Sequence, residues 1–288
     1  MKSAKIRKVI SDLEDLPTLP RIVLRITELV NNPKCSAQDL ARVITDDQVL
    51  TARLLRLVNS SFYGFPQKIS TVTGAIVLLG FDAIRNLLLS TSILELFRDK
   101  GKKKRSKGED FWDHSLGCAV AAKVIGEFLG NEKGEELFVA GLLHDIGKIV
   151  EMLFLPEEFA EITSLVEEKD VLMVVAEKEV LDYTHMDIGR LLAQKWNLPE
   201  KFTEVITHHH SPEKADGFSQ ETAIVHLADI LVRALEIGWG GDNKIPVLNK
   251  TAWEILGLEL SDIGFLMETI EEGFGGINVF ATDPKDSQ

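Results

Sequence analysis

Histidine and aspartate residues whose side chains could hold metal ions are spread along the second half of the chain. His144 and Asp145 are adjacent in an otherwise apolar stretch, and Asp229 lies inside the apolar run 224–235. Burying a charged carboxylate among leucines is unfavourable unless a counter-charge compensates, and a metal ion is the strongest one available. The pattern therefore predicts a buried divalent-metal site, to which further histidines could contribute: His114, His185, His208, His209 and His210.

Each of these residues also has an ordinary explanation when it is taken alone. His114 or His185 could be a hydrogen-bonded core histidine or a surface one. The three consecutive histidines 208–210 could be a polar helix end, where a protonated imidazole favours the negative end of the helix dipole. Asp229 could accept a hydrogen bond between packed helices. Only the combination of all these residues favours a metal site.

The available donor atoms limit the choice of metal. Imidazole and carboxylate together suit iron, manganese, zinc or nickel, whereas an oxygen-only shell would suit magnesium or calcium. The chain has 2 cysteines, Cys35 and Cys118, each alone in a helix-like context. This spacing disfavours a disulfide framework or a thiolate cage, so we expect nitrogen and oxygen ligands.

Helical periodicity predicts the elements that carry these residues. Apolar side chains repeat at helical spacing on both sides of the basic run 100–107, and Ser36 is placed to cap a helix. Strand-like alternation is limited to the β-branched piece 171–175, which could be strand or helix. The sequence predicts an all-α fold with helices in the second half at 109–129, 135–154, 156–169, 184–196, 199–209, 221–236 and 250–278.

Charge divides the chain into two unlike parts. Residues 1–105 carry 18 Lys and Arg against 10 Asp and Glu, while residues 106–288 carry 14 against 35. We therefore expect two helical parts, 1–105 and 106–288, joined at the run KGKKKRSK (100–107). That run is typical of a solvated linker, with an anion-binding patch as the alternative. The acidic second part repels phosphate backbones, so nucleic acid is not an expected partner.

Nothing in the sequence indicates a membrane protein. With 288 residues and 45% hydrophobic residues, the chain is typical of a soluble globular protein. No stretch approaches the roughly 20 apolar residues that cross a bilayer, and the start is amphipathic without an apolar export segment. These features favour a cytoplasmic location.

The order of the candidate ligands resembles the HD superfamily of metal-dependent phosphohydrolases, whose defining motif is an HDIGK-like segment. That segment is present at 144–148, and the likeness covers roughly residues 108–236. The first half is similar to the remainder of an HDOD domain, the HD-related output domain of bacterial signalling proteins, at LPTLP (16–20), in 46–60 and in 75–80. The resemblance implies a multi-helix HDOD unit in which the two parts are subdomains.

Ligand roles follow from the resemblance. It implies a basic set made of His114, His144, Asp145 and Asp229, with Asp145 bridging two ions. The added ligands of dinuclear members would be His185, His208 and His209, with Asp110 as a further acidic ligand. Lys148 would face a substrate phosphate beside the catalytic Asp145, unless it is a surface lysine. His210 and His226 stay outside the ligand set, with His226 supporting Asp229. One or two ions are implied, iron or manganese rather than zinc, nickel or magnesium.

Two functions remain open on these grounds. One is a regulatory signalling module whose metal site is structural or senses a ligand, acting with a signalling partner. The other is an active phosphohydrolase or phosphodiesterase on a nucleotide or other phosphoester. After the three histidines comes Ser211-Pro212-Glu213, and the Gly-Tyr-Pro segment of the cyclic-dinucleotide phosphodiesterases is absent. Specific hydrolysis of cyclic di-GMP is therefore not expected.

Overall fold

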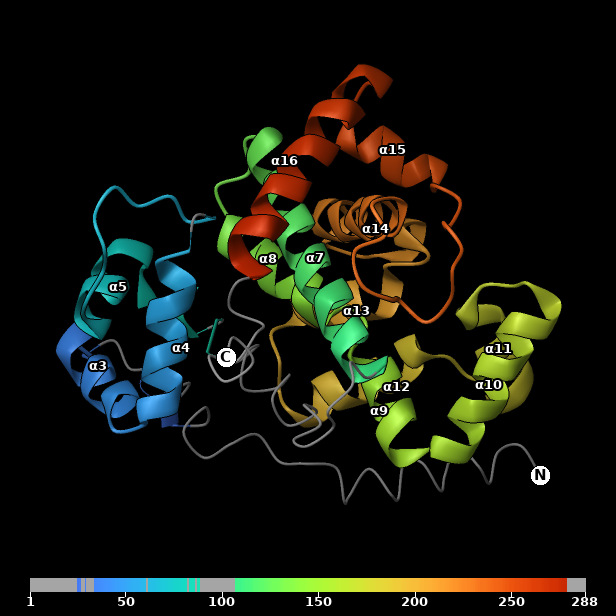
Figure 1. Ribbon diagram of the computed structural model, residues 1–288, viewed down its shortest axis with the longest axis horizontal. Helices are drawn as coiled ribbons and strands as arrows, with labels where there is room; N and C mark the ends of the chain where they lie inside the picture. The colour runs from blue at the N-terminus through green and yellow to red at the C-terminus, as the bar shows by residue number, and fades with distance from the viewer. Residues whose placement is uncertain are drawn as a thin grey trace, which may run out of the picture. The chain divides into compact units, whose positions relative to one another are not determined.

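The regular elements of the protein are helices throughout the described part of the chain (Figure 1). The computed structural model describes residues 25, 26, 29, 34–60, 62–81, 83–85, 87, 88 and 107–278. The all-α prediction is confirmed. Within these residues no helix combines the length and apolar character that a membrane span requires.

Two compact units make up the chain. One comprises residues 19–96 with 268–288, and the other comprises residues 97–267 with 1–18. The boundary predicted at 105/106 and most of the basic run 100–107 lie outside the described residues.

The smaller unit is built from three described helices, α3 (Ala37–Thr45), α4 (Gln48–Val58) and α5 (Val72–Leu79), which pack on one another. Ser36 caps α3 as predicted: its hydroxyl accepts from the Asp39 amide, and the Asp39 carboxylate accepts from the Ser36 amide. Asn59 joins α4 to the segment before α5, because its amide group donates to the Ile69 carbonyl and accepts from the Ile69 amide. The enclosed side chains form a core of their own, which includes Leu40, Ile44, Leu54, Val58, Ala75 and Ile76.

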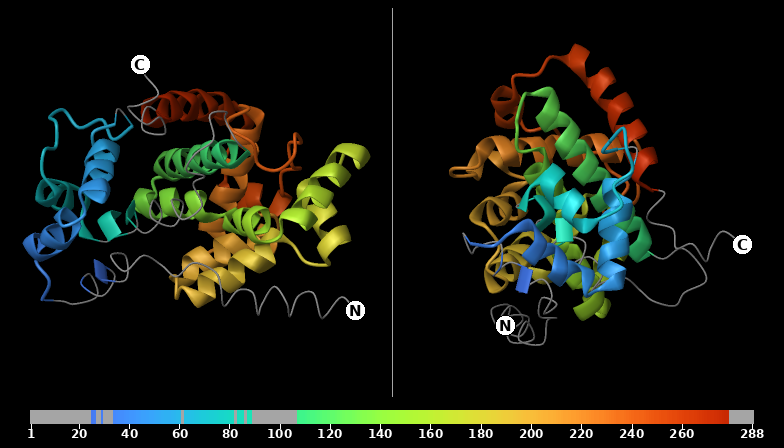
Figure 2. Two further views of the ribbon diagram at one scale, coloured as in Figure 1. Left: turned by 60° about the horizontal axis from the view of Figure 1, so that its bottom comes forward. Right: turned by 90° about the vertical axis from the view of Figure 1, so that its left-hand side faces the viewer.

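The larger unit surrounds a long central helix, α7 (Lys107–Phe128), which packs against α8 (Gly134–Leu143) and α14 (Ser219–Ala234). Helix α9 (Ile146–Phe154) packs on α12 (His185–Lys195), which in turn packs on α13 (Glu200–His208). Figure 2 shows α10 (Pro156–Lys169) and α11 (Met173–Leu181) side by side, in agreement with their contacts. A short 3₁₀ turn (Pro212–Lys214) and α15 (Lys250–Leu256) follow, and α16 (Leu260–Asn278) begins in this unit and continues past residue 267 into residues assigned to the smaller one.

The helix predicted across 135–154 is interrupted at the His144-Asp145 pair, so that prediction was wrong in one respect. His144 ends α8 in helical conformation, and Asp145 leaves it with φ −101° and ψ 16° before α9 begins. Neighbouring side chains on a continuous helix point about 100° apart. The break frees the pair from that constraint, so both side chains can face one centre.

Two other predictions of secondary structure can be compared with the observed helices. The segment 171–175 enters a helix, since α11 starts at Met173. The helix predicted over 250–278 is divided, because Gly257 ends α15 with φ 62°, a left-handed conformation that glycine adopts without strain.

Candidate metal centre

Four buried side chains from three helical segments converge in what we call cluster A: His114, Cys118, His144 and Asp229. Each offers one ligand atom, and these atoms all lie within 4.8 Å of one another. His114 and Cys118 come from α7, His144 ends α8, and Asp229 projects from α14. The His114 Nε2 atom lies 3.2 Å from Asp229 Oδ1.

A second group, cluster B, consists of Asp145, His185, His209 and His210, and its ligand atoms also lie within 4.8 Å of one another. Asp145 precedes α9, His185 is the first residue of α12, and His209 ends α13. His210 is partly exposed, whereas the other three side chains are buried.

Asp145 lies between the two clusters and turns one carboxylate oxygen toward each. Its Oδ2 atom is 3.3 Å from His144 Nε2 and 3.6 Å from His114 Nε2. Its Oδ1 atom is 3.3 Å from His185 Nε2 and 3.5 Å from His209 Nε2. A carboxylate in this position can bridge two cations.

Three of the imidazoles make contacts at Nδ1, whereas the buried Nδ1 atom of His114 has no hydrogen-bond partner among the described residues. His144 Nδ1 donates to the Gly141 carbonyl at 2.7 Å, and His209 Nδ1 lies 3.1 Å from the Ile206 carbonyl. His185 Nδ1 donates to Glu177 Oε2 at 2.8 Å, and the His185 amide donates to the same oxygen at 2.9 Å. We assign each proton to Nδ1 on this basis, which leaves an Nε2 lone pair directed at the centre.

Several polar atoms at the centre are left without partners. Among the described residues, His144 Nε2 and Asp145 Oδ1 have no hydrogen-bond partner although both are buried. The Nε2 atoms of His185 and His209 face each other at 3.3 Å, an unfavourable approach of two lone pairs unless a positive charge lies between them. Buried polar atoms are normally satisfied, so these residues fit a bound divalent cation.

The ionisation states agree with a ligand set. Burial lowers the pKa of His185 and of His209, so both imidazoles are neutral near pH 7. Burial by itself raises the pKa of Asp145, but the neighbouring His144 and Lys148 outweigh it and hold the pKa well below the usual value. The same balance operates at Asp229, where Arg233 and His114 keep the pKa low. Neutral imidazoles and ionised carboxylates are the forms that bind metal.

Two buried cations accompany the carboxylates. Lys148 Nζ lies 2.6 Å from Asp145 Oδ2 and donates to the Gly240 carbonyl at 2.8 Å. Arg233 Nε donates to Asp229 Oδ1 at 2.8 Å, and another of its nitrogens also donates to Gly240 O. Asp242 pairs with Arg233 and accepts from the Met173 amide. These contacts fasten the loop after α14 next to the centre.

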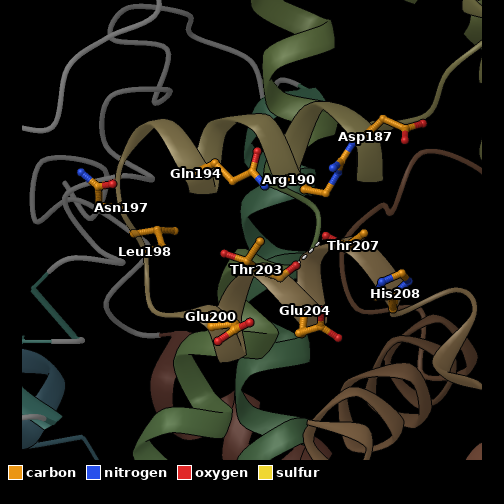
Figure 3. Close-up of a pocket in the computed structure, with 10 residues that line it drawn as sticks. All are labelled: Asp187, Arg190, Gln194, Asn197, Leu198, Glu200, Thr203, Glu204, Thr207 and His208. Carbon is orange, nitrogen blue, oxygen red and sulfur yellow. Dashed lines mark hydrogen bonds between the residues drawn. The ribbon is translucent and has the colours of Figure 1, made fainter. Parts of the chain in front are cut away.

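Three residues that the sequence nominated are placed elsewhere. His208 lines a pocket of about 710 Å³ between α12 and α13 together with Arg190, Gln194 and Thr203, and is not part of either cluster (Figure 3). Asp110 also belongs to neither cluster, and its carbonyl accepts from the Trp239 amide. His226 does not bond Asp229 directly: its Nδ1 donates to the His209 carbonyl and its Nε2 accepts from the Asn249 amide.

Sequence reasoning missed three residues of the centre. Cys118 was set aside because it is far from Cys35, yet its spacing of four residues from His114 places both on one face of α7. His210 takes the place predicted for His208, because α13 ends at His208 and the chain turns there. Glu177, which holds His185, lies only 8 residues before it, but the sequence does not show that the turn between α11 and α12 brings the two side chains together.

The chain matches one family model and is similar to several solved structures. A family model described as the HDOD domain matches residues 16–212, so the match ends before Asp229. The crystal structure of an HDOD domain protein from Geobacter sulfurreducens is 30% identical, covers 96% of this chain and 97% of that one, and has a TM-score of 0.79. A protein of Shewanella amazonensis SB2B, provisionally assigned as a phosphohydrolase, is 26% identical over 95% of this chain and 97% of that one, with a TM-score of 0.72.

A curated relative from Treponema pallidum is 26% identical over 238 residues, which is 82% of this chain and 46% of that protein. This chain thus spans about half the length of that relative.

Proposed function

Because this chain belongs to the HDOD domain family, we propose that it is a signal-transduction module whose larger unit holds a dinuclear divalent-metal site with a regulatory role. The observation that carries the proposal is the paired arrangement of clusters A and B around Asp145. The unpartnered atoms at the centre support bound cations, and the family supports the regulatory setting.

Burial favours regulation over turnover. The side chains of His114, His185 and His209 are 0% exposed, and Asp145 and Asp229 are each 2% exposed. Lys148 already has two partners in Asp145 and the Gly240 carbonyl. To pair with Lys148, a phosphoester would have to displace these two contacts, whereas a metal ion needs far less room. Such a site can stabilise one conformation for a signalling partner to recognise.

Imidazole and carboxylate donors suit iron or manganese, with zinc and nickel as further candidates and magnesium as the least suited. When bound, such ions polarise phosphoryl oxygens and lower the pKa of water. The protein's own contribution is to orient the imidazoles through Nδ1 and to keep bulk water out. A nucleotide or other phosphoester would be the ligand that the ions attract, and nucleic acid is disfavoured by the acidic surroundings.

One observation favours a second function, metal-dependent phosphoester hydrolysis. The bridging position of Asp145 is the arrangement that a two-metal hydrolase needs, and the relative from Shewanella amazonensis is provisionally assigned to that class. In this case Lys148 would leave the Gly240 carbonyl to contact a substrate phosphate, and Asp145 would help to hold both ions.

Metal analysis and a turnover screen separate the two functions. The purified protein should contain close to two equivalents of metal, and Asp145→Ala should lose both, since both clusters use that carboxylate. Asp216→Ala, an exposed aspartate outside the clusters, is the matched control and should keep its metal. Mononucleotides and cyclic dinucleotides are then tested for phosphate release or ring opening with Mn²⁺ or Fe²⁺.

Full metal content without turnover is the result expected for the regulatory module. Turnover that Asp145→Ala abolishes and Asp216→Ala retains would establish hydrolysis instead. A wild-type protein that binds no divalent metal would contradict both functions.

A further inference from the structure

Cys118 lies inside cluster A with its sulfur directed at the other donors. It follows His114 by four residues on α7, and its Sγ atom is 3.7 Å from His114 Nε2. The side chain is 0% exposed. The sulfur therefore lies among the atoms that would surround an ion at cluster A, together with His144 and Asp229.

The distances in cluster A match those between donors in a tetrahedral site. With metal–sulfur and metal–nitrogen bonds of about 2.3 and 2.0 Å, a sulfur and a nitrogen donor lie about 3.6 Å apart, and a nitrogen and an oxygen donor about 3.3 Å apart. The structure has 3.7 Å between Cys118 Sγ and His114 Nε2 and 3.2 Å between His114 Nε2 and Asp229 Oδ1. These two separations are those expected when His114 shares an ion with Cys118 and with Asp229.

An independent observation indicates that cluster A binds a ligand. His144 Nε2 is buried and has no hydrogen-bond partner, while the Nδ1 atom of the same ring is occupied by the Gly141 carbonyl. The free lone pair belongs to the same set of converging atoms as Cys118 Sγ. A small buried cysteine could by itself be mere core packing, but packing does not account for the unpaired imidazole beside it.

We propose that Cys118 is a thiolate ligand of the ion at cluster A, and that this cluster prefers thiophilic ions such as Zn²⁺ or Cd²⁺ to Mn²⁺ or Mg²⁺. The proposal rests on the metal site of the proposed function and adds a sulfur donor that HD-type histidine and aspartate ligands do not supply. Soft thiolate ligands select zinc-like ions, whereas cluster B, with imidazole and carboxylate donors, keeps a broader choice. The two positions of the centre are therefore chemically different.

Binding is a ligand exchange without oxidation or reduction. The S–H bond breaks, its electron pair forms the sulfur–metal bond, and the proton passes to the buffer. The local charge favours this exchange once the ion is present. Lys148 and Arg233 already balance the negative charges of Asp145 and Asp229. The negative charge of the thiolate therefore offsets positive charge that the ion adds. Without an ion, burial and the two aspartates raise the pKa of the Cys118 thiol.

Cobalt spectroscopy tests the sulfur ligand directly. Metal is removed from the full chain with a chelator under reducing conditions, and the protein is then titrated with Co²⁺. The absorption spectrum of bound Co²⁺ depends on its ligands. Wild-type protein should develop a near-ultraviolet sulfur-to-cobalt charge-transfer band. Cys118→Ser should bind Co²⁺ with d–d bands but without the charge-transfer band. Cys35→Ser, the matched control at the other cysteine, should keep the band.

Affinity measurements supply the second readout. Cys118→Ser should weaken Cd²⁺ binding more than about tenfold, because the site loses its sulfur ligand. Binding of Mn²⁺ should change less than about threefold, because Mn²⁺ has little preference for sulfur. Circular dichroism and thermal unfolding of the metal-free variants show whether each is folded. If Cys118→Ser does not fold, Cys35→Ser decides, because Cys118 is then the remaining cysteine of a chain that has 2.

The outcomes separate this proposal from the one on which it rests. Bound Co²⁺ without a charge-transfer band in wild-type or Cys35→Ser protein overturns the thiolate ligand and leaves the metal site standing. A charge-transfer band that persists in Cys118→Ser likewise overturns the thiolate ligand and leaves the metal site standing. Failure of wild-type protein to bind Co²⁺ at all overturns both proposals.

Discussion

Glu151 and Glu177 are fully buried carboxyl groups close to the metal-ligand residues. Burial raises the pKa of Glu177 to about 7, and burial together with the charge of Glu177 raises the pKa of Glu151 well above its usual value. Both oxygens of Glu151 lack a hydrogen-bond partner among the described residues, which disfavours its charged form further. The fold is therefore most stable when at least one of these two carboxyl groups is protonated.

This pair makes the stability of the metal-free protein depend on pH. A carboxyl group whose pKa is higher in the folded than in the unfolded chain stabilises the fold at low pH, and that contribution is lost as the pH rises through the folded pKa. For Glu177 the window runs from 4.5 to about 7. We expect the free energy of unfolding of chelator-treated protein to fall across this window, measured by urea denaturation at successive pH values.

Glu151→Gln should flatten that fall, because it removes a buried carboxyl group whose own pKa is raised well above its usual value. Glu179→Gln, at an exposed position on α11, the helix that carries Glu177, is the control and should retain the wild-type slope. An unchanged slope in Glu151→Gln would show that the pair does not govern the pH dependence.

Single residues also show what could and could not be predicted from sequence. The His144-Asp145 pair and Asp229 stood out because charge inside an apolar helix needs a counter-charge, and the structure brings both to one centre. The choice between His208 and His210 depends on where α13 ends, which differs by a residue or two between equally good periodic patterns. The inclusion of Cys118 depends on the rotation of α7 against α8 and α14, which is set by tertiary packing.

The approach of α9 to α12 is an element-level feature that the ligand geometry depends on. A Cβ atom placed on Gly147 would lie 1.9 Å from the carbonyl oxygen of His185, far inside van der Waals contact. Glycine is therefore required for the start of α9 to pass this close to the start of α12. The same contact fixes the distance between Asp145, before α9, and His185, in α12.

Gly147→Ala should push these two helices apart. Overpacking of this kind costs about 1–3 kcal/mol of stability. Metal content should fall too, with cluster B affected first because His185 moves away from Asp145. Calorimetry and metal analysis of the variant measure both effects.

Gly264→Ala is the matched control, since a Cβ at that helical position meets nothing within 4 Å. It should be neutral or slightly stabilising, by up to about 1 kcal/mol, because alanine favours helix more than glycine does. Wild-type metal content and stability in Gly147→Ala would contradict the proposed role of the close approach.

The helix pattern was predicted well from the sequence, except for the break at His144 and Asp145, the division at Gly257 and helix α11. The periodic signal located α7, α10, α12, α13 and α14 to within a few residues. It could not show the break at His144 and Asp145, because apolar residues continue on both sides and neither residue is a helix breaker. That break is maintained by what the two side chains contact, and those contacts come from distant parts of the chain.

At the scale of the whole molecule, the candidate ligands all belong to one compact unit, while the other unit has its own core. A ligand that binds only the folded form stabilises it by mass action, by about 2.7 kcal/mol at a concentration 100 times its dissociation constant. Removal of metal should therefore lower the unfolding temperature of the unit that contains residues 97–267. The unit that contains residues 19–96 should be unaffected.

Tryptophan fluorescence can follow the metal-binding unit selectively, because all 4 tryptophans lie within residues 97–267. We expect chelation to shift the fluorescence-detected transition to lower temperature, and added Mn²⁺ or Zn²⁺ to restore it. Calorimetry of the same samples reports both units. A calorimetric trace that shifts as a whole by the same amount would contradict separate unfolding of the two units.

The placement of Asp145 has a consequence for how the centre fills. In the proposed dinuclear centre one carboxylate would serve both positions, so a first ion would fix the side-chain rotamer that a second ion needs and at the same time add like charge beside it. Occupancy of one position changes the affinity of the other, and thermodynamic reciprocity makes the factor equal in both directions. The protein would therefore have four chemically distinct forms, empty, filled at cluster A alone, filled at cluster B alone and filled at both, and the surrounding metal concentration would set their proportions.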